Sequence, residues 1–169
     1  MGCGKSTIGR ILAAELNYKF VDIDNFIEKI SGLTISEIFS NQGENKFREY
    51  ESEALAGICD KDNIVVATGG GTPCFYGNMK TMSDNGMTIY LKTESEILYR
   101  RLVAEYTTRP LLKGLSDEER KKYITTTLQE REPDYLKAKI VIETGNYTEQ
   151  QLLNLILKEA AKIRSGNLS

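Results

Sequence analysis

Gly2-Cys3-Gly4-Lys5-Ser6-Thr7 is the stretch that decides the fold, and a run with helical spacing follows it. Its last four residues match the latter part of a phosphate-binding loop, in which backbone N–H groups approach phosphates, lysine reaches the outer phosphates and a hydroxyl ligates magnesium. Apolar residues from Lys5 to Leu16 recur on one helical face, so the loop lies at a helix N-terminus, where the dipole favours an anion. The stretch predicts a site for a nucleoside triphosphate and Mg²⁺. An ordinary glycine-bearing helix start is the alternative.

Predicted strands and helices alternate along the rest of the chain. Short apolar segments predict strands over residues 19–24, 64–68, 87–91 and 140–143. Amphipathic segments predict helices over residues 25–31, 35–40, 44–60, 94–103, 116–131 and 148–163. This alternation predicts an α/β fold with a mainly parallel central sheet covered by helices on both faces.

Composition excludes several classes of function. The 169 residues, 40% of them hydrophobic, suffice for one domain with a substantial core. A net charge of -2 gives no electrostatic case for nucleic acid or membrane as a partner, and no apolar run approaches the roughly 20 residues of a membrane span. The three scattered cysteines fit a reducing cytoplasm better than a disulfide framework or a zinc cluster. Because the chain has no histidine, histidine base chemistry is excluded.

Two carboxylates stand where the first predicted strand ends. Asp22 and Asp24 are two residues apart, so both side chains would project from one face near the carboxyl edge of the sheet. One could hold magnesium through its water shell, and the other could accept a hydrogen bond from a substrate hydroxyl. The alternative is that Asp24 caps the next helix and Asp22 is solvated.

A glycine run and three arginines complete the candidate residues. Gly69-Gly70-Gly71 follows a predicted buried strand, and we expect its main-chain N–H groups to face a ligand rather than to form only a flexible turn. Arg48 and Arg131 would each be expected on the surface if considered alone, but together they could clamp a substrate carboxylate. Arg109, in a segment without periodicity, could close over ATP or be a plain loop residue.

The chain resembles shikimate kinase on motifs that run almost from end to end. They are GCGKST (residues 2–7), FVDID (20–24), FREYE (47–51), VVATGGGT (65–72), TRPLL (108–112) and QEREPDY (129–135). The first motif is shared by many nucleotide enzymes, whereas the combination of the others is specific. The resemblance implies a three-layer α/β/α P-loop kinase of one domain, with a substrate-binding subdomain at about 25–53 and a lid at about 104–118.

The implied reaction moves the γ-phosphoryl group of ATP to the 3-hydroxyl of shikimate, as a step of aromatic amino acid biosynthesis in the cytoplasm. The implied catalytic residues are Lys5, Asp24 and Arg109. The implied ATP-binding residues are Gly2, Cys3, Gly4, Lys5, Ser6, Thr7 and Arg109. The implied shikimate-binding residues are Asp24, Arg48, Gly70, Gly71 and Arg131, and the implied magnesium ligands are Ser6 and Asp22. We expect a monomer with no nucleic-acid or membrane partner.

The chain departs from the family pattern at two places. Where relatives often carry a basic residue near adenine, it has Asn146 and Tyr147, so no adenine contact is assigned there. Relatives also have an apolar strand that ends in the first loop glycine, whereas Met1 of this chain aligns inside their loop. We therefore expect the first, central strand to be missing from this sequence, and a start assigned roughly ten residues too late would account for it.

Two other functions remain open at this stage. One is a kinase for another small polyol acid, such as gluconate, although the DID, FRxxE and RPLL motifs together are not expected in such an enzyme. The other is a truncated homologue that binds nucleotide without turnover.

Overall fold

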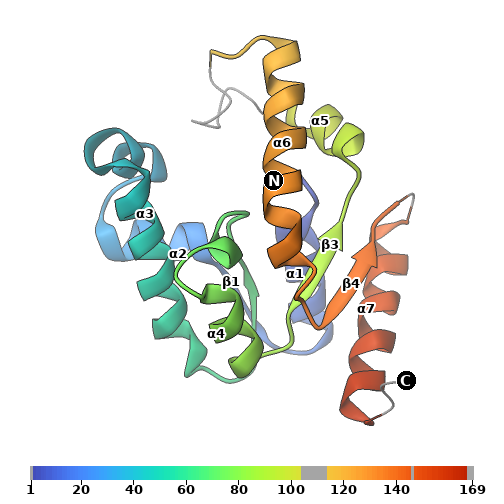
Figure 1. The fold of residues 1–169 in the computed structure, drawn as a ribbon. Helices are drawn as coiled ribbons and strands as arrows, with labels where there is room; N and C mark the ends of the chain where they lie inside the picture. Colours follow the sequence, from blue (N-terminus) through green and yellow to red (C-terminus); the bar gives the residue numbers. More distant parts are fainter. Residues whose placement is uncertain (1, 104–113, 146, 167–169) are drawn as a thin grey trace.

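The computed structural model describes residues 2–103, 114–145 and 147–166. In this part of the chain the strands are β1 (Lys19–Asp22), β2 (Ile64–Ala67), β3 (Ile89–Lys92) and β4 (Ile140–Glu143). The helices are α1 (Lys5–Glu15), α2 (Ile23–Ser31), α3 (Ile35–Cys59), the 3₁₀ turn η1 (Thr72–Cys74), α4 (Asn78–Asn85), α5 (Ser95–Val103), α6 (Asp117–Tyr135) and α7 (Glu149–Arg164). This order confirms the predicted α/β class (Figure 1).

The strands form two parallel pairs rather than the single sheet predicted from the sequence. In one pair, β1 lies beside β2 with Lys19 opposite Ile64; in the other, β3 lies beside β4 with Ile89 opposite Ile140. In the described residues β2 and β3 are not paired with each other, and a cavity of about 760 Å³ is lined by both. The parallel direction was predicted correctly, and two separate pairs agree with the prediction that a central strand is missing from this sequence.

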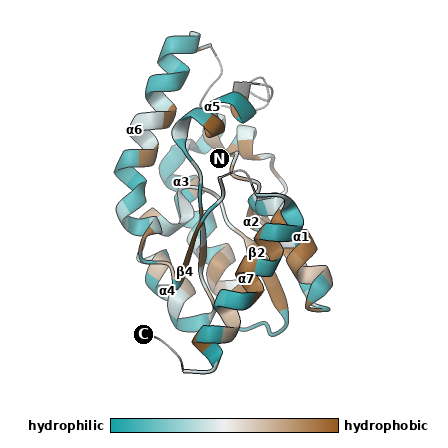
Figure 2. Cartoon of the chain, turned by 90° about the vertical axis from the view of Figure 1, so that its right-hand side faces the viewer, coloured by the Kyte–Doolittle hydropathy of each residue, from teal (hydrophilic) through white to brown (hydrophobic). Residues whose placement is uncertain are grey.

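Each pair of strands has its own apolar core. One core joins α1, β3, β4 and α7 and consists of Ile8, Leu12, Leu91, Ile140, Ile142, Leu152, Leu153 and Ile156. A second core gathers the apolar face of α2 and α3, with Ile23, Ile27, Ile38, Phe47, Ala54, Leu55 and Ile58. A third, smaller core packs α5 on α6. In Figure 2 the brown, apolar sides of α1 and α7 face inward while their teal sides face out.

Helix boundaries follow local chemistry. Three capping boxes, opened by Thr34, Ser116 and Thr148, start α3, α6 and α7. Gly43, with φ 82° and ψ 171°, interrupts α3 between the two helices predicted there.

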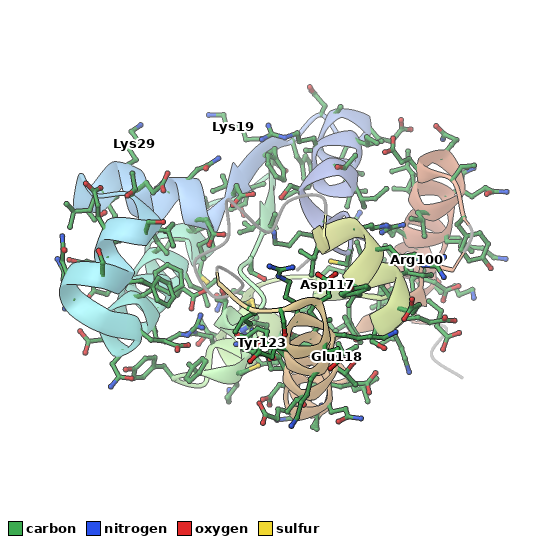
Figure 3. The ribbon with its side chains drawn as sticks, turned by 90° about the horizontal axis from the view of Figure 1, so that it is seen from above. Lys19, Lys29, Arg100, Asp117, Glu118 and Tyr123 are labelled. Carbon is green, nitrogen blue, oxygen red and sulfur yellow. The ribbon has the colours of Figure 1, made fainter. Side chains whose placement is uncertain are left out.

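Lys19 of β1 and Lys29 of α2 point outward from the molecule (Figure 3).

Two helical segments were predicted wrongly. The helix α4 was missed because Asn78–Asn85 is polar apart from its two methionines and gives little apolar periodicity. The helix α6 continues to Tyr135, past Arg131 where the sequence predicted its end. Its internal Pro133 lies in the last turn and removes one backbone hydrogen bond, but it does not end the helix. None of the described helices is long and apolar enough to span a bilayer.

Candidate active site

The phosphate loop leads directly into the first turn of α1. Gly4 is the N-cap with φ 84° and Gly2 has φ 69°, left-handed conformations that favour glycine. A Cβ on Gly2 would lie 3.1 Å from Leu102 Cγ, so the loop also packs tightly against α5. Because a glycine N-cap has no side chain to accept from the first-turn N–H groups, these donors can face a phosphate. Lys5, the first residue of α1, is half-buried and lines the large cavity.

Ser6 and Asp22 lie side by side. The hydroxyl of Ser6 donates to Asp22 Oδ2 at 2.9 Å, and the other carboxylate oxygen accepts from the backbone N–H of Asp24 at 3.2 Å. A hydroxyl next to a carboxylate, both half-buried, is the kind of oxygen pair that Mg²⁺ uses while it keeps several waters. The two predicted magnesium ligands therefore fit the ion.

Asp24 does not lie at the end of a strand, so the prediction that Asp22 and Asp24 project from one strand face was wrong. The strand β1 ends at Asp22, which caps α2, and Asp24 lies in the first turn of that helix. The alternative, in which Asp24 caps the next helix, was also wrong, because Asp22 is the residue that caps α2. Asp24 nevertheless reaches the glycine run, since a Cβ built on Gly69 would lie 3.3 Å from Asp24 Oδ1.

The glycine run Gly69–Gly71 lies against charged side chains. A Cβ on Gly69 would be 2.6 Å from Glu51 Oε1, and one on Gly71 would be 2.3 Å from Arg48 Nη1. The backbone of Gly71 has φ -87°, which any residue can adopt, so the missing side chain is what matters here. The run therefore brings its backbone against the functional groups of α2 and α3.

Arg48 is buried, contrary to the expectation for a lone arginine. It is 4% exposed, and its Nη1 donates to Glu51 Oε2 at 2.6 Å, while Thr72 donates its hydroxyl to the other oxygen of Glu51. Its Nη2 donates to Glu44 Oε1 at 2.6 Å, and the guanidinium lies 4.7 Å from the Phe75 ring centroid. Burial lowers the pKa of Arg48, but the ion pairs outweigh burial and the pKa lies above its ordinary value.

Arg131 on α6 and Arg48 on α3 both influence the pKa of the Cys74 thiol. Burial raises the pKa of Cys74 to about 11, and Arg131 and Arg48 both oppose that shift. Burial likewise raises the pKa of Tyr135 to about 12, again opposed by Arg131. The 3₁₀ turn at Cys74 contacts both α3, which carries Arg48, and α6, which carries Arg131.

Comparison with known proteins assigns the family. A model of the shikimate kinase family matches residues 1–161. The chain belongs to the shikimate kinase family. A shikimate kinase of Phocaeicola vulgatus is 45% identical over 151 residues, which cover 89% of this chain and 86% of that protein. The crystal structure of the Bacteroides thetaiotaomicron shikimate kinase is similar with a TM-score of 0.87 at 34% identity, covering 94% of this chain and 92% of that one.

A second solved structure carries a ligand. The shikimate kinase of Acinetobacter baumannii in complex with shikimate has a TM-score of 0.88 and 34% identity, covering 100% of this chain and 91% of that one. These similarities confirm the P-loop kinase fold and the class of the enzyme, an ATP-dependent kinase.

One predicted part of the site lies outside the described residues, and two residues of the site were not predicted. Arg109 and most of the expected lid fall outside the described residues, whereas Asp117 and Glu118, at its far end, belong to α6. Tyr135 was not predicted as a site residue, yet its hydroxyl donates to the carbonyl of Gly70 at 2.5 Å. Glu51 was also missed, although it stands in the FREYE motif three residues after Arg48, the spacing of a helical ion pair.

Proposed function

We propose that the chain transfers the γ-phosphoryl group of ATP to the 3-hydroxyl of shikimate, giving shikimate 3-phosphate and ADP. The observation that carries this proposal is the meeting of Asp24, Arg48 and the Gly69–Gly71 run, next to the Ser6–Asp22 pair. A buried guanidinium close to the Asp24 carboxylate suits a small acid that also carries hydroxyls. The A. baumannii relative in complex with shikimate supports this choice of acid.

The phosphate loop is the proposed ATP site. The backbone N–H groups of Gly2–Thr7 would surround the phosphates, and Lys5 would contact them directly. Ser6 and Asp22 would hold Mg²⁺, which offsets charge on the phosphates when bound. Arg109 stays a proposed lid residue that reaches ATP.

Arg48 and Arg131 are the proposed partners of the substrate carboxylate. Glu51 is fully buried and holds one end of the Arg48 fork, while Glu44, 46% exposed in its side chain, occupies the other. Glu44 Oε1 accepts from Arg48 Nε at 3.1 Å and from Arg48 Nη2 at 2.6 Å. Because the Glu44 side chain can turn to solvent, a substrate carboxylate can replace it at these two nitrogen atoms. Gly70 and Gly71 would complete the pocket, and Asp24 would orient the 3-hydroxyl and accept its proton.

A coupled assay of ADP formation tests the function. With ATP and Mg²⁺, we expect saturable ADP formation with shikimate and none above background with gluconate or other hydroxylated acids. Preference for gluconate would instead assign the other polyol-acid kinase. ATP binding without shikimate-dependent ADP formation would assign the inactive homologue.

We also propose that the enzyme is a cytoplasmic monomer without nucleic-acid or membrane partners. The balanced charge of 22 basic and 24 acidic residues supports this. Light scattering during size-exclusion chromatography measures the oligomeric state, and a mass of two chains would contradict it.

Ser6→Ala is expected to raise the Mg²⁺ concentration for half-maximal activity at least about tenfold, because one oxygen ligand is lost. A magnesium titration of the initial rate measures this shift. Ser165→Ala, at the exposed end of α7, is the control and should leave the titration unchanged. An equal response of the two variants would remove Ser6 from the metal site.

Gly71→Ala is expected to raise the KM for shikimate about tenfold or more and to lower the melting temperature, because the Arg48–Glu51 ion pair is disturbed. The new Cβ would lie 2.3 to 2.7 Å from three atoms of the Arg48 guanidinium, which must move away. Gly57→Ala in α3 meets no atom within 4 Å and should be neutral or slightly stabilising. Unchanged KM in Gly71→Ala would show that the guanidinium position does not govern substrate binding.

Tyr135→Phe is expected to raise the KM for shikimate about fivefold while kcat changes little, because the lost hydrogen bond is worth about 1 kcal/mol. That bond fixes the carbonyl of Gly70 and hence the glycine run. Steady-state kinetics measure the effect, with Tyr147→Phe, at a residue 50% exposed, as the control. A fall in kcat at constant KM would assign Tyr135 a different role.

A further inference from the structure

The backbone turn between η1 and α4 is strained at a residue that is not glycine. Tyr76 has φ 51° and Gly77 has φ 70°, and the N–H of Asn78 donates to the carbonyl of Phe75 at 2.9 Å. Two successive left-handed residues enclosed by such a bond are the pattern of a type I′ turn, which favours glycine, asparagine or aspartate at both central positions. Strain at a bulky tyrosine persists only where the surrounding structure fixes the turn.

Hydrogen bonds fix the backbone on either side of Phe75. The side-chain amide of Asn78, a residue only 2% exposed, donates to the carbonyl of Thr72 at 3.0 Å. The N–H of Cys74 donates to the carbonyl of Gly71 at 2.9 Å. These bonds connect the turn to the end of the glycine run, so the position of Phe75 relative to the acceptor site is determined by the backbone.

Phe75 places its aromatic ring against the guanidinium of Arg48. The ring centroid lies 4.7 Å from Arg48 Cζ, although Phe75 itself is 37% exposed. Within the described residues Phe75 belongs to none of the three apolar cores, so core packing does not account for its position. Glu44 and Glu51 bind nitrogen atoms at the edge of the guanidinium. A ring over its central carbon restrains the remaining motion, the tilt of the plane.

We propose that Phe75 is a positioning residue, which holds the guanidinium of Arg48 in the orientation that receives the substrate carboxylate. The inference rests on the proposed role of Arg48 as a ligand of that carboxylate. A planar guanidinium binds a carboxylate through two parallel hydrogen bonds, so a tilt of the plane weakens both bonds at once. Phe75 acts through Arg48, and its loss therefore affects substrate binding rather than the transfer of the phosphoryl group.

Steady-state kinetics at saturating ATP test this role. Phe75→Leu keeps an apolar side chain but removes the aromatic face, and we expect it to raise the KM for shikimate about fivefold while kcat changes less than about twofold. Phe75→Tyr keeps the ring and should restore the KM to within about twofold of the parent. Tyr76→Asn replaces the neighbouring aromatic residue, which is 60% exposed, by one that tolerates the left-handed conformation. It is the matched control and should leave the KM unchanged.

The methyl ester of shikimate separates action through Arg48 from contact with the substrate ring. The ester carries no carboxylate charge, so it cannot form the paired charge-assisted hydrogen bonds. We expect Phe75→Leu to lower kcat/KM about fivefold for shikimate and less than about twofold for the ester. Equal losses for the two substrates would show that Phe75 does not act through the carboxylate ligand.

Chemical labelling of Arg48 tests the positioning without turnover. Phenylglyoxal reacts with guanidinium groups, and peptide mass spectrometry measures its rate of reaction at Arg48, which is 4% exposed. In the enzyme without substrate, we expect labelling of Arg48 at least about threefold faster in Phe75→Leu than in the parent, because one contact of the guanidinium is removed. The rate at Arg164, at the exposed end of α7, should be equal in both proteins.

Any one of four outcomes overturns the proposal. They are a KM of Phe75→Leu within twofold of the parent, no restoration in Phe75→Tyr, equal losses with shikimate and its ester, and unchanged labelling of Arg48. Circular dichroism verifies that the variants fold. A parent enzyme that forms no ADP with shikimate would contradict the proposed function instead, and the labelling rates would still decide whether Phe75 holds the guanidinium.

Discussion

Arg48→Met is expected to abolish saturation by shikimate at accessible concentrations and to lower the free energy of unfolding by about 3 kcal/mol. The variant removes the proposed carboxylate ligand and leaves the fully buried Glu51 without its ion-pair partner at 2.6 Å. Kinetics with varied shikimate measure the first effect, and urea denaturation measures the second. Lys46→Met on the same helix, with a side chain 41% exposed, should change neither.

The double variant Arg48→Met with Glu51→Gln separates stability from binding. Glutamine is neutral, so it removes the uncompensated buried charge while it still accepts from Thr72. We expect much of the lost stability to return while shikimate saturation does not. If stability and shikimate binding returned together, Arg48 would be a structural residue and not a ligand of the substrate.

Asp24→Asn is expected to lower kcat about 100-fold to 1000-fold and to change ATP binding less than about twofold. Asparagine has nearly the same shape as aspartate, but it cannot accept the proton of the 3-hydroxyl. Asp24 lies at the glycine run, on α2, whereas the phosphate loop leads into α1. Pre-steady-state kinetics and titration with a non-hydrolysable ATP analogue measure the two effects.

Asp84→Asn, on the exposed surface of α4, is the matched control for Asp24→Asn and should leave kcat unchanged. A kcat of Asp24→Asn near that of the parent would remove Asp24 from catalysis. Weaker binding of the ATP analogue with unchanged kcat would place the residue at the nucleotide instead.

Sequence patterns were sufficient where a structural element depends on its own residues. The start of the helix at residue 35, the strand over residues 140–143 and the loop before α1 are decided within a few residues, and all were predicted. The residue at which β1 ends and α2 begins was not predicted correctly. Asp24 was placed on a strand because FVDID reads as a continuous run, but the side chain of Asp22 starts α2 two residues earlier.

Tertiary contacts were the part that the sequence could not provide. The burial of Arg48 depends on Glu51 on its own helix and on Thr72, which lies 21 residues after Glu51. The hydrogen bond of Tyr135 to Gly70 joins residues 65 positions apart. Sheet continuity is likewise a tertiary property, and alternation of strands and helices predicts direction without deciding which strands become neighbours.

The separation of the strands into two pairs has a consequence for the cooperativity of unfolding. No backbone ladder in the described residues joins β1 and β2 to β3 and β4, so packing of side chains must couple the two halves. The helix α1 provides it, because Ile8 and Leu12 belong to the core with β3 and β4 while Gly9 packs against Phe20 of β1. The helix that follows the phosphate loop therefore couples the unfolding of the β1–β2 half to the unfolding of the β3–β4 half.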